Sequence, residues 1–237
     1  VSNAGDVNGD GYDDIIIGAQ NYSSSTGRAY IYYGGLSMST IANVILTGGA
    51  ANNYFGRSVS SAGDVNGDGY SDVIVGAYGY TSSTGRAYIY FGGAPMNNIA
   101  DVTMTGETTF NLFGISVSTA GDVNGDGVPD IVVSADAGSS PQVAVYELET
   151  LRLLGSFSPY AAAFQGGVRV ATGDINGDGV AEIMTGPGAG ITPQVNVYSA
   201  LNFDTPSSFL AFAANFTAGI SVAAPTEVDV LLRDGFE

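Results

Sequence analysis

The stretch Asp64–Asp72 reads DVNGDGYSD, and close copies of it occur at three other places in the chain. These copies are DVNGDGYDD from Asp6, DVNGDGVPD from Asp122 and DINGDGVAE from Asp174. Each has the form Asp-x-Asn-x-Asp-Gly-x-x-Asp, with Glu in the last place of the fourth. Oxygen-bearing side chains at positions 1, 3, 5 and 9 are the ligands that Ca²⁺ prefers, and Gly at position 6 allows a sharp turn around an ion. The pattern predicts a calcium loop at each copy, hence about four Ca²⁺ per chain.

The spacing of the loops indicates a tandem repeat. The loops begin at residues 6, 64, 122 and 174, which gives intervals of 58, 58 and 52 residues. Other phrases recur with them: FGRSVSSAGD at Phe55 matches FGISVSTAGD at Phe113, and STGRAYIYYGG at Ser25 matches STGRAYIYFGG at Ser83. Each loop is followed by a β-type run and not by a helix. A fixed period of this kind predicts one structural unit repeated along the chain.

The second repeat predicts the unit itself. Strands are expected over 58–63, 72–77, 86–91 and 101–105, with the calcium loop at 64–72 and a polar loop at 78–85. The run DVIVGA is apolar throughout, which is typical of a strand buried on both faces. Four strands in a meander, repeated, make a propeller blade. The sequence therefore predicts an all-β fold, a β-propeller of four four-stranded blades with calcium loops in its β-hairpins.

These residues carry a family resemblance. Phe-Gly, the Asp-rich loop and a following Gly-Ala resemble FG-GAP repeats, the blade unit of the integrin α-subunit propeller. The marks are Phe55-Gly56, Phe113-Gly114, Gly18-Ala19 and Gly76-Ala77. The resemblance covers nearly the whole chain, from Val1 to about Ala224. Repeats three and four depart from the pattern, with Ser134-Ala135 and Gly186-Pro187 in place of Gly-Ala, and are more similar to the FG-GAP-like repeats of large secreted bacterial proteins.

The resemblance implies a ligand set for each ion. It comprises the side chains of loop positions 1, 3, 5 and 9 and the backbone carbonyl of position 7. The expected metal ligands are Asp6, Asn8, Asp10, Tyr12 and Asp14; Asp64, Asn66, Asp68, Tyr70 and Asp72; Asp122, Asn124, Asp126, Val128 and Asp130; and Asp174, Asn176, Asp178, Val180 and Glu182. Because Glu182 is one methylene longer than Asp, we expect the fourth site to be looser or bidentate, and the most tolerant of calcium depletion.

The domain organisation follows from the repeats. We expect one propeller over residues 1–224, with blades at roughly 1–50, 51–108, 109–162 and 163–214, then a surplus strand. FTAGISVAA from Phe216 matches FQGGVRVAT from Phe164, but no calcium loop follows it. Residues 225–237 are expected to form a C-terminal strand and tail, completing a surplus hairpin with a strand at 228–232.

The surplus strand and the short start of blade one, VSNAG, are complementary, which predicts closure by strand exchange. We expect exchange between chains, as a head-to-tail series. A four-bladed ring, a dimeric ring and a fragment of a longer protein remain alternatives.

Composition limits the function classes. The net charge is −17, and 13 of the 23 acidic residues lie inside the four loops. The chain has no Cys, no His, no Lys and only six Arg, which excludes nucleic acid as a partner and removes most nucleophile–base pairs. No apolar run approaches the ~18 residues of a membrane span. We therefore expect a protein that is not an enzyme.

The expected function is that of a calcium-binding structural or adhesion protein, secreted and extracellular or at a cell surface, where calcium is abundant. Its partners would be other copies of itself, an extracellular protein or a glycan. One alternative is a carbohydrate-binding, lectin-like module or the accessory domain of a secreted polysaccharide-active enzyme. Another is a calcium-dependent polysaccharide lyase or hydrolase, against which the lack of Lys and His counts. The recurring tyrosines of the third strands are expected to fill the space between blades rather than to stack on sugars; they are Tyr30, Tyr32, Tyr88, Tyr90, Tyr146 and Tyr198.

Overall fold

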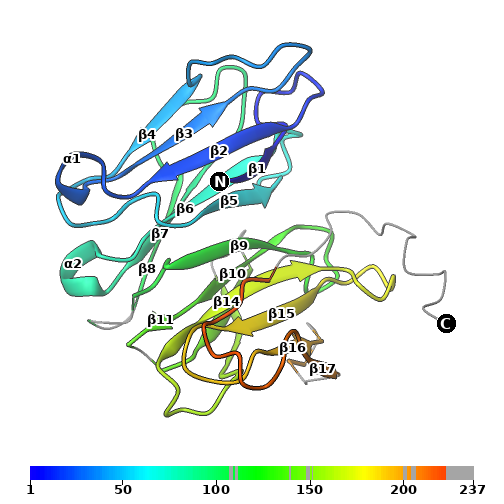
Figure 1. The fold of residues 1–237 in the computed structure, drawn as a ribbon. Helices are drawn as coiled ribbons and strands as arrows, with labels where there is room; N and C mark the ends of the chain where they lie inside the picture. Colours follow the sequence, from blue (N-terminus) through cyan, green and yellow to red (C-terminus); the bar gives the residue numbers. More distant parts are fainter. Residues whose placement is uncertain are drawn as a thin grey trace.

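The chain folds into four antiparallel β-sheets, one for each repeat (Figure 1). The computed structural model describes residues 1–106, 109, 112–138, 140–147, 150, 152–199, 202–203 and 207–222. Blade one contains β1 (Ser2–Gly5), β2 (Asp14–Ala19), β3 (Arg28–Tyr32) and β4 (Val44–Thr47); blade two contains β5 (Val59–Gly63), β6 (Asp72–Ala77), β7 (Arg86–Tyr90) and β8 (Val102–Thr105). Blade three contains β9 (Ser116–Gly121), β10 (Asp130–Ser134), β12 (Val143–Glu147) and β13 (Arg152–Phe157); blade four contains β14 (Gly166–Gly173), β15 (Glu182–Pro187), β16 (Gln194–Tyr198) and β17 (Ser207–Leu210), with the short β11 (Asp136–Ala137) paired to β14. The all-β fold of four-stranded blades is confirmed.

The first strands of the four blades surround a common axis. β1 contacts β5, β5 contacts β9, and β9 contacts β14. Residues of all four strands line one central hollow of about 540 Å³, which Val222 also lines. The calcium-type loops follow these inner strands, so they all lie at one end of the axis, on the right in Figure 1. The fold thus gathers four copies of the acidic motif at one rim.

Phe-Gly segments hold blade two to blade one and blade three to blade two. Phe55 is almost fully buried and pairs through a parallel bridge with Gly27 of blade one. The Gly56 amide donates to the carbonyl of Gly76. A Cβ added to Gly18 would lie 2.0 Å from the Gly56 carbonyl oxygen, which is closer than any side-chain atom tolerates. The Gly of the Gly-Ala mark is therefore required by the close approach of the next repeat's backbone.

The predicted polar loops contain one turn of unusual backbone. The short helices α1 (Tyr22–Ser25) and α2 (Tyr80–Ser83) place three consecutive residues at positive φ, with Ser23, Ser24 and Ser25 between 45° and 59°. That conformation costs roughly 1–2 kcal/mol per residue. The carbonyls of Ser24 and Ser25 accept hydrogen bonds from the amides of Asn52 and Tyr54, which lead into blade two. The turn therefore presents carbonyls to the next repeat and serves as an inter-blade contact.

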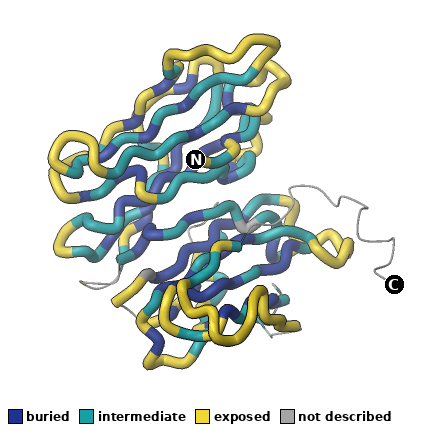
Figure 2. Tube along the Cα trace, viewed as in Figure 1, coloured by how far each residue is buried: buried dark blue, intermediate teal, exposed yellow. Residues whose placement is uncertain are grey.

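Packing between blades is mostly as expected. β6 is buried at every position, which confirms the reading of DVIVGA. Tyr88, Tyr90, Tyr146 and Tyr198 lie in or against the inter-blade clusters, so the prediction for these four is confirmed. The side chains of Tyr30 and Tyr32 are partly exposed on blade one. Figure 2 shows burial concentrated where blades face one another.

The surplus segment packs against blade four. The Ile220 amide donates to the Pro187 carbonyl, and the Gly190 amide donates to the Thr217 carbonyl. The equivalent bonds on blade three are made by the segment that begins at Phe164. Residues 216–222 therefore lie where the surplus strand was expected, but among the described residues they form no strand. The predicted strand at 228–232 and the tail lie outside the described residues. Strand exchange between chains stays a prediction.

Candidate metal centres

The first carboxylate of each loop holds the loop closed. Asp6 accepts hydrogen bonds from the backbone amides of Gly9 (2.7 Å), Asp10 (3.1 Å) and Gly11 (2.8 Å). Gly9 and Gly11 have φ of 74° and 87°, a region that a non-glycine residue enters only at a cost. The sequence folds into this turn because the acceptor and the two glycines occur at the required spacing.

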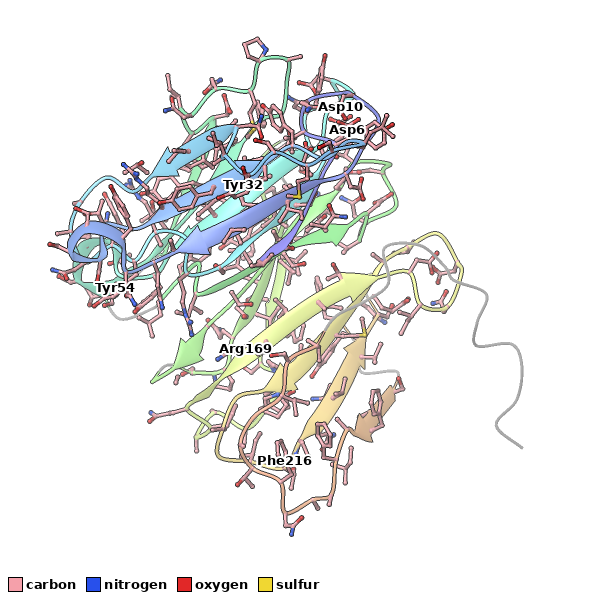
Figure 3. The ribbon with its side chains drawn as sticks, turned by 45° about the horizontal axis from the view of Figure 1, so that its top comes forward. Asp6, Asp10, Tyr32, Tyr54, Arg169 and Phe216 are labelled. Carbon is pink, nitrogen blue, oxygen red and sulfur yellow. The ribbon has the colours of Figure 1, made fainter. Side chains whose placement is uncertain are left out.

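The middle positions form a second, smaller network. The Asn8 side-chain oxygen accepts from the Asp10 amide at 2.9 Å, and its Nδ2 donates to Asp10 Oδ2 at 3.0 Å. Asp10 Oδ1 in turn accepts from the Tyr12 amide at 3.0 Å. Figure 3 shows Asp6 and Asp10 together at the loop. Equivalent bonds occur at Asn66–Asp68–Tyr70, Asn124–Asp126–Val128 and Asn176–Asp178–Val180.

The last carboxylate of each loop is buried. Asp14, Asp72, Asp130 and Glu182 expose 1%, 0%, 1% and 5% of their surface. Asp72 accepts from the Val65 and Gly92 amides, each at 2.8 Å. Burial raises the pKa of Asp72 to about 6, and the nearby carboxylates of Asp68 and Asp64 add to the rise. These amides compensate the charge only in part, so a cation would be favoured beside it.

The other buried carboxylates behave in the same way. Burial raises the pKa of Asp130 to about 6, and it also raises the pKa of Asp14 and of Glu182. In each case the two preceding loop carboxylates contribute in the same direction. Four separate places in the fold thus bury a carboxylate next to two others.

One hydrogen-bond donor to the buried carboxylates could not be predicted from the sequence. The glycine pair after the third strand reads only as a strand breaker, yet the Gly92 amide donates to Asp72, and the Gly34 amide donates to Asp14 at 2.7 Å. The repeated Gly-Gly after YIYY and YIYF was the available signal. A contact across 20 residues cannot be inferred from it without the fold.

The fourth loop differs in geometry. Glu182 accepts from the Ile175 amide at 3.0 Å and also from Asn176 Nδ2 at 2.7 Å. The inner strands β1, β5 and β9 each contain a register shift just before the loop, whereas β14 pairs with β15 without one. The longer side chain therefore accompanies a regular strand, and its carboxylate still reaches the position-2 amide. Whether the site is looser stays a prediction.

Neighbouring loops contact one another along the rim. The Ser71 amide donates to the Asp6 carbonyl at 2.9 Å, and the Ala181 amide donates to the Asp122 carbonyl at 3.0 Å. At the corresponding place between loops two and three stands Pro129, which has no amide hydrogen. The Tyr70 ring lies over Gly9, where an added Cβ would be 2.5 Å from Cε1. The loops are therefore adjacent parts of one rim.

The donors fit a hard cation, although the ligand sphere is not assembled. Each loop offers three carboxylates, one amide oxygen and a backbone carbonyl, all of them oxygen donors of the class that Ca²⁺ takes. As the side chains stand, no three acidic groups of the described residues converge on a point that could hold a metal ion. The reason is visible in the hydrogen bonds, since the position-1 and position-5 carboxylates turn toward amides of their own loop.

Comparison with known proteins identifies the repeats. A model described as "FG-GAP repeat" matches residues 1–32 and 55–90, and one described as "FG-GAP-like repeat" matches residues 122–185. These ranges include all four loops. The division between them agrees with the two subtypes predicted from the sequence.

Several curated relatives are similar over part of the chain. Integrin alpha-5 of Xenopus laevis is 33% identical over 147 residues, covering 56% of this chain and 14% of its own length. Integrin alpha-PS2 of Drosophila melanogaster is 32% identical, covering 66% and 12%. Phosphatidylinositol-glycan-specific phospholipase D of Bos taurus is 34% identical, covering 55% and 17%. The chain thus spans less than a fifth of the length of these relatives.

Among solved structures, the rhamnogalacturonan lyase YesX superposes with a TM-score of 0.49 at 14% identity, covering 83% of this chain and 44% of its own. Sqt1 from Chaetomium thermophilum gives 0.48 at 13% identity, covering 88% and 48%. The sequence matches, the Phe-Gly contacts and the four-stranded sheets agree with one another. The chain is an FG-GAP repeat protein, and its repeats are homologous to those of the integrin α-subunit propeller region.

Proposed function

We propose that the chain is a calcium-stabilised, non-enzymatic binding module of an extracellular structural or adhesion protein. The observation that carries the proposal is the buried ninth carboxylate, present in all four loops beside two further carboxylates. A buried charge that backbone amides compensate only in part is costly, and a divalent cation beside it would supply further compensation.

Calcium suits this site better than other common metals. The loops contain no thiolate or imidazole, which are the ligands of zinc and copper sites. The backbone of each loop is already turned around its first carboxylate. An ion would therefore need only side-chain rotations at positions 1, 3 and 5 to complete its shell. About four ions would be held per chain, one per loop.

Extracellular placement is supported by the type of site. Exposed oxygen loops of this kind bind calcium in the range of about 10⁻⁴–10⁻³ M in extracellular modules, which matches calcium levels outside cells. The chain has no disulfide that could hold the blades together. None of the helices in the described residues is long and apolar enough to cross a membrane.

An exposed apolar edge on blade four supports a proposed partner surface. The edge strand β17 is exposed at every residue, and its Phe209 and Leu210 expose 57% and 51% of their surface. Phe212 and Phe216 follow it, also exposed, and Figure 3 shows Phe216 at the outer end of the blade. Exposed strand edges with apolar side chains are typical of association sites. We propose that other copies of the chain, or an extracellular protein, bind here.

The proposal is tested first through calcium and stability. Asp68→Ala removes the proposed position-5 ligand of blade two. Asp101→Ala removes an exposed carboxylate outside the loops, which accepts the Phe91 amide. Thermal unfolding is measured for both with and without calcium. The account predicts that Asp68→Ala loses part of the calcium-dependent rise in melting temperature, while Asp101→Ala keeps all of it. An equal loss in both, or an unchanged wild-type curve without calcium, would contradict the proposal.

Partner type is tested separately. Sedimentation over a range of protein concentrations measures self-association, and a glycan array measures sugar binding by the calcium-loaded chain. The leading proposal predicts self-association that Phe209→Ser weakens. Binding to a glycan class without self-association would instead support the carbohydrate-binding alternative.

A further inference from the structure

A phenylalanine at the start of each of blades two, three and four contacts at least one aromatic ring in the interface with the preceding blade. Between blades one and two, Phe55 contacts Tyr88 with ring centroids 5.5 Å apart at 63°, and Tyr90 at 6.3 Å and 85°. These edge-to-face arrangements are favourable for aromatic pairs. Two rings from β7 thus fill the space beneath Phe55.

The interface between blades three and four keeps this arrangement with a different residue. Phe164 contacts Tyr160 at 5.5 Å and 76°. The Tyr160 hydroxyl donates to the Gln194 carbonyl at 3.0 Å. At the β16 position that corresponds to Tyr88 stands Asn196, so the ring comes from the segment after β13. The aromatic ring beside this phenylalanine therefore comes from the third strand of the blade at Tyr88, and from the segment before Phe164 at Tyr160.

The interface between blades two and three lacks that ring in the described residues. Phe113 contacts Tyr146 at 6.1 Å and 79°, which matches the contact between Phe55 and Tyr90. The counterpart of Tyr88 is Ala144, because Tyr88 pairs with Val75 and Ala144 pairs with Val133 at the same place in the hairpin. A methyl group thus stands where the repeat has a phenol.

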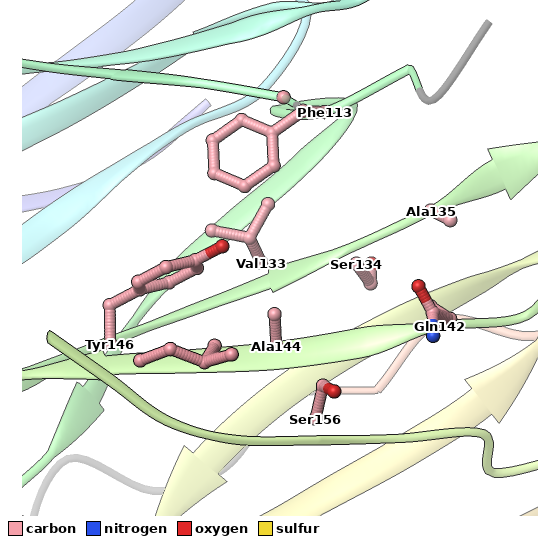
Figure 4. A pocket seen from close by; sticks show the side chains of 10 residues that line it. Phe113, Val133, Ser134, Ala135, Gln142, Ala144, Tyr146 and Ser156 are labelled. Atoms are coloured by element: carbon pink, nitrogen blue, oxygen red, sulfur yellow. The ribbon is translucent and has the colours of Figure 1, made fainter. Parts of the chain in front are cut away.

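A pocket of about 160 Å³ lies at this position (Figure 4). Its apolar wall includes Phe113, Val133, Ala144 and Leu153. Leu153 is 46% exposed and lies at the mouth. The polar side chains of Ser134, Gln142 and Ser156 also line the pocket, and Figure 4 shows them on the side away from Tyr146. A cavity of about 150 Å³ can hold a benzene ring, so this pocket has the size of one aromatic ring, although it is open to solvent and partly polar in its lining.

We propose that this pocket binds a phenolic ring. The other interfaces of the molecule support this proposal. The same position holds the Tyr88 ring in one interface, and Tyr160 makes an equivalent contact in another. A bound ring would meet the Phe113 edge as Tyr88 meets Phe55, and its hydroxyl would find Gln142 or Ser156. The ring can belong to a free phenolic compound or to a tyrosine presented by another polypeptide.

The test uses p-cresol as the probe on the full calcium-loaded chain. Binding is measured by isothermal titration and by chemical-shift changes at residues around the pocket. Ala144→Tyr restores the phenol of the repeat and fills the space, while Ala144→Ser is the matched control that leaves it open. We expect wild type and Ala144→Ser to bind p-cresol equally, and Ala144→Tyr to lose at least about tenfold in affinity, because the ring already occupies the site. If Ala144→Tyr does not fold, Ala144→Leu takes its place.

Three outcomes would overturn the proposal. One is equal binding by wild type and Ala144→Tyr, which would place p-cresol elsewhere. Another is binding of monosaccharides in place of p-cresol. The third is the absence of p-cresol binding by the wild-type chain, which would show that the pocket does not accept a phenolic ring. A tyrosine-containing peptide that binds as well as p-cresol identifies a polypeptide source, and p-cresol binding alone identifies a free compound; both support the phenolic site.

Discussion

Acidification should change the stability of the metal-free protein and of the calcium-bound protein in opposite directions. Asp72 and Asp130 have folded-state pKa values of about 6, above the ordinary value of 3.8. A carboxyl group whose pKa is raised by folding destabilises the fold once it is charged. That penalty is absent below about pH 4, grows as the pH rises from about 4 to about 6, and changes little at higher pH. The metal-free protein should therefore gain stability when the pH falls from about 7 to about 5.

The magnitude follows from the size of the shifts. A rise of roughly two units corresponds to about 3 kcal/mol per group at neutral pH. Close to half of this is recovered by about pH 5, so the two groups together contribute roughly 2–3 kcal/mol. Asp14 and Glu182 are shifted in the same direction and add to the effect. For a chain of this length the gain corresponds to about 5–10 °C in melting temperature.

Calcium should reverse the trend. Protons compete with the ion for the same carboxylates, so acidification weakens calcium binding and lowers the stability that it supplies. The measurement is denaturant unfolding at several pH values, in calcium-depleted and calcium-containing buffer. Asp72→Asn, which cannot titrate, should remove the Asp72 share of the metal-free gain, which is about half of what Asp72 and Asp130 contribute together. A metal-free protein whose stability falls steadily from pH 7 to 5 would refute the reasoning.

Three further predictions concern packing and assembly. Gly76→Ala would place its Cβ 1.8 Å from the Gly114 carbonyl oxygen, so it should lower the free energy of unfolding by about 3 kcal/mol or more in denaturant unfolding. Gly49→Ala is the control, because its Cβ would enter open space and should change the stability little. Equal effects of the two substitutions would contradict the close contact between blades. Phe55→Ala should cost about 3–5 kcal/mol, against less than about 0.5 for the exposed Phe209→Ala, by the same assay. Deleting residues 216–237 should convert any polymer to monomers in sedimentation experiments; a compact full-length monomer at high concentration that the deletion only destabilises would count against intermolecular exchange.

Much of the fold could be predicted because the same pattern of strands and loops occurs several times along the chain. The expected strand 72–77 is observed at Asp72–Ala77, and the other strands of repeat two differ by one residue at an end. Apolar runs and glycine pairs are local signals, so they mark strand limits well. The left-handed turn at Ser23–Ser25 could not be predicted, because serine does not require positive φ. Its stabilising partners, the amides of Asn52 and Tyr54, lie in the next repeat.

The residues of the candidate site could be predicted from the sequence, but the burial of its carboxylates could not. The spacing of oxygen-bearing residues selects Asp64, Asn66, Asp68 and Asp72 as candidate ligands from the sequence alone. The sequence does not show that Asp72 is buried while Asp68 is exposed, since both are acids in one polar loop. That difference arises from the neighbouring strands and from the Gly92 amide, and it decides which carboxylate most needs a cation. Likewise, the pocket at Ala144 could not be predicted, because the strand pairing of the structure is needed to show that Ala144 occupies the position of Tyr88.

Calcium stoichiometry tests the central claim most directly. Equilibrium dialysis of the purified chain, with bound calcium counted by elemental analysis, gives the number of ions per chain. The account predicts about four at saturating calcium, and one fewer in a variant with Asp64→Ala and Asp68→Ala combined. On depletion, the loop that contains Glu182 should lose its ion most readily. A value of zero or one for the wild-type chain would contradict the account and would leave the four acidic loops as turns alone.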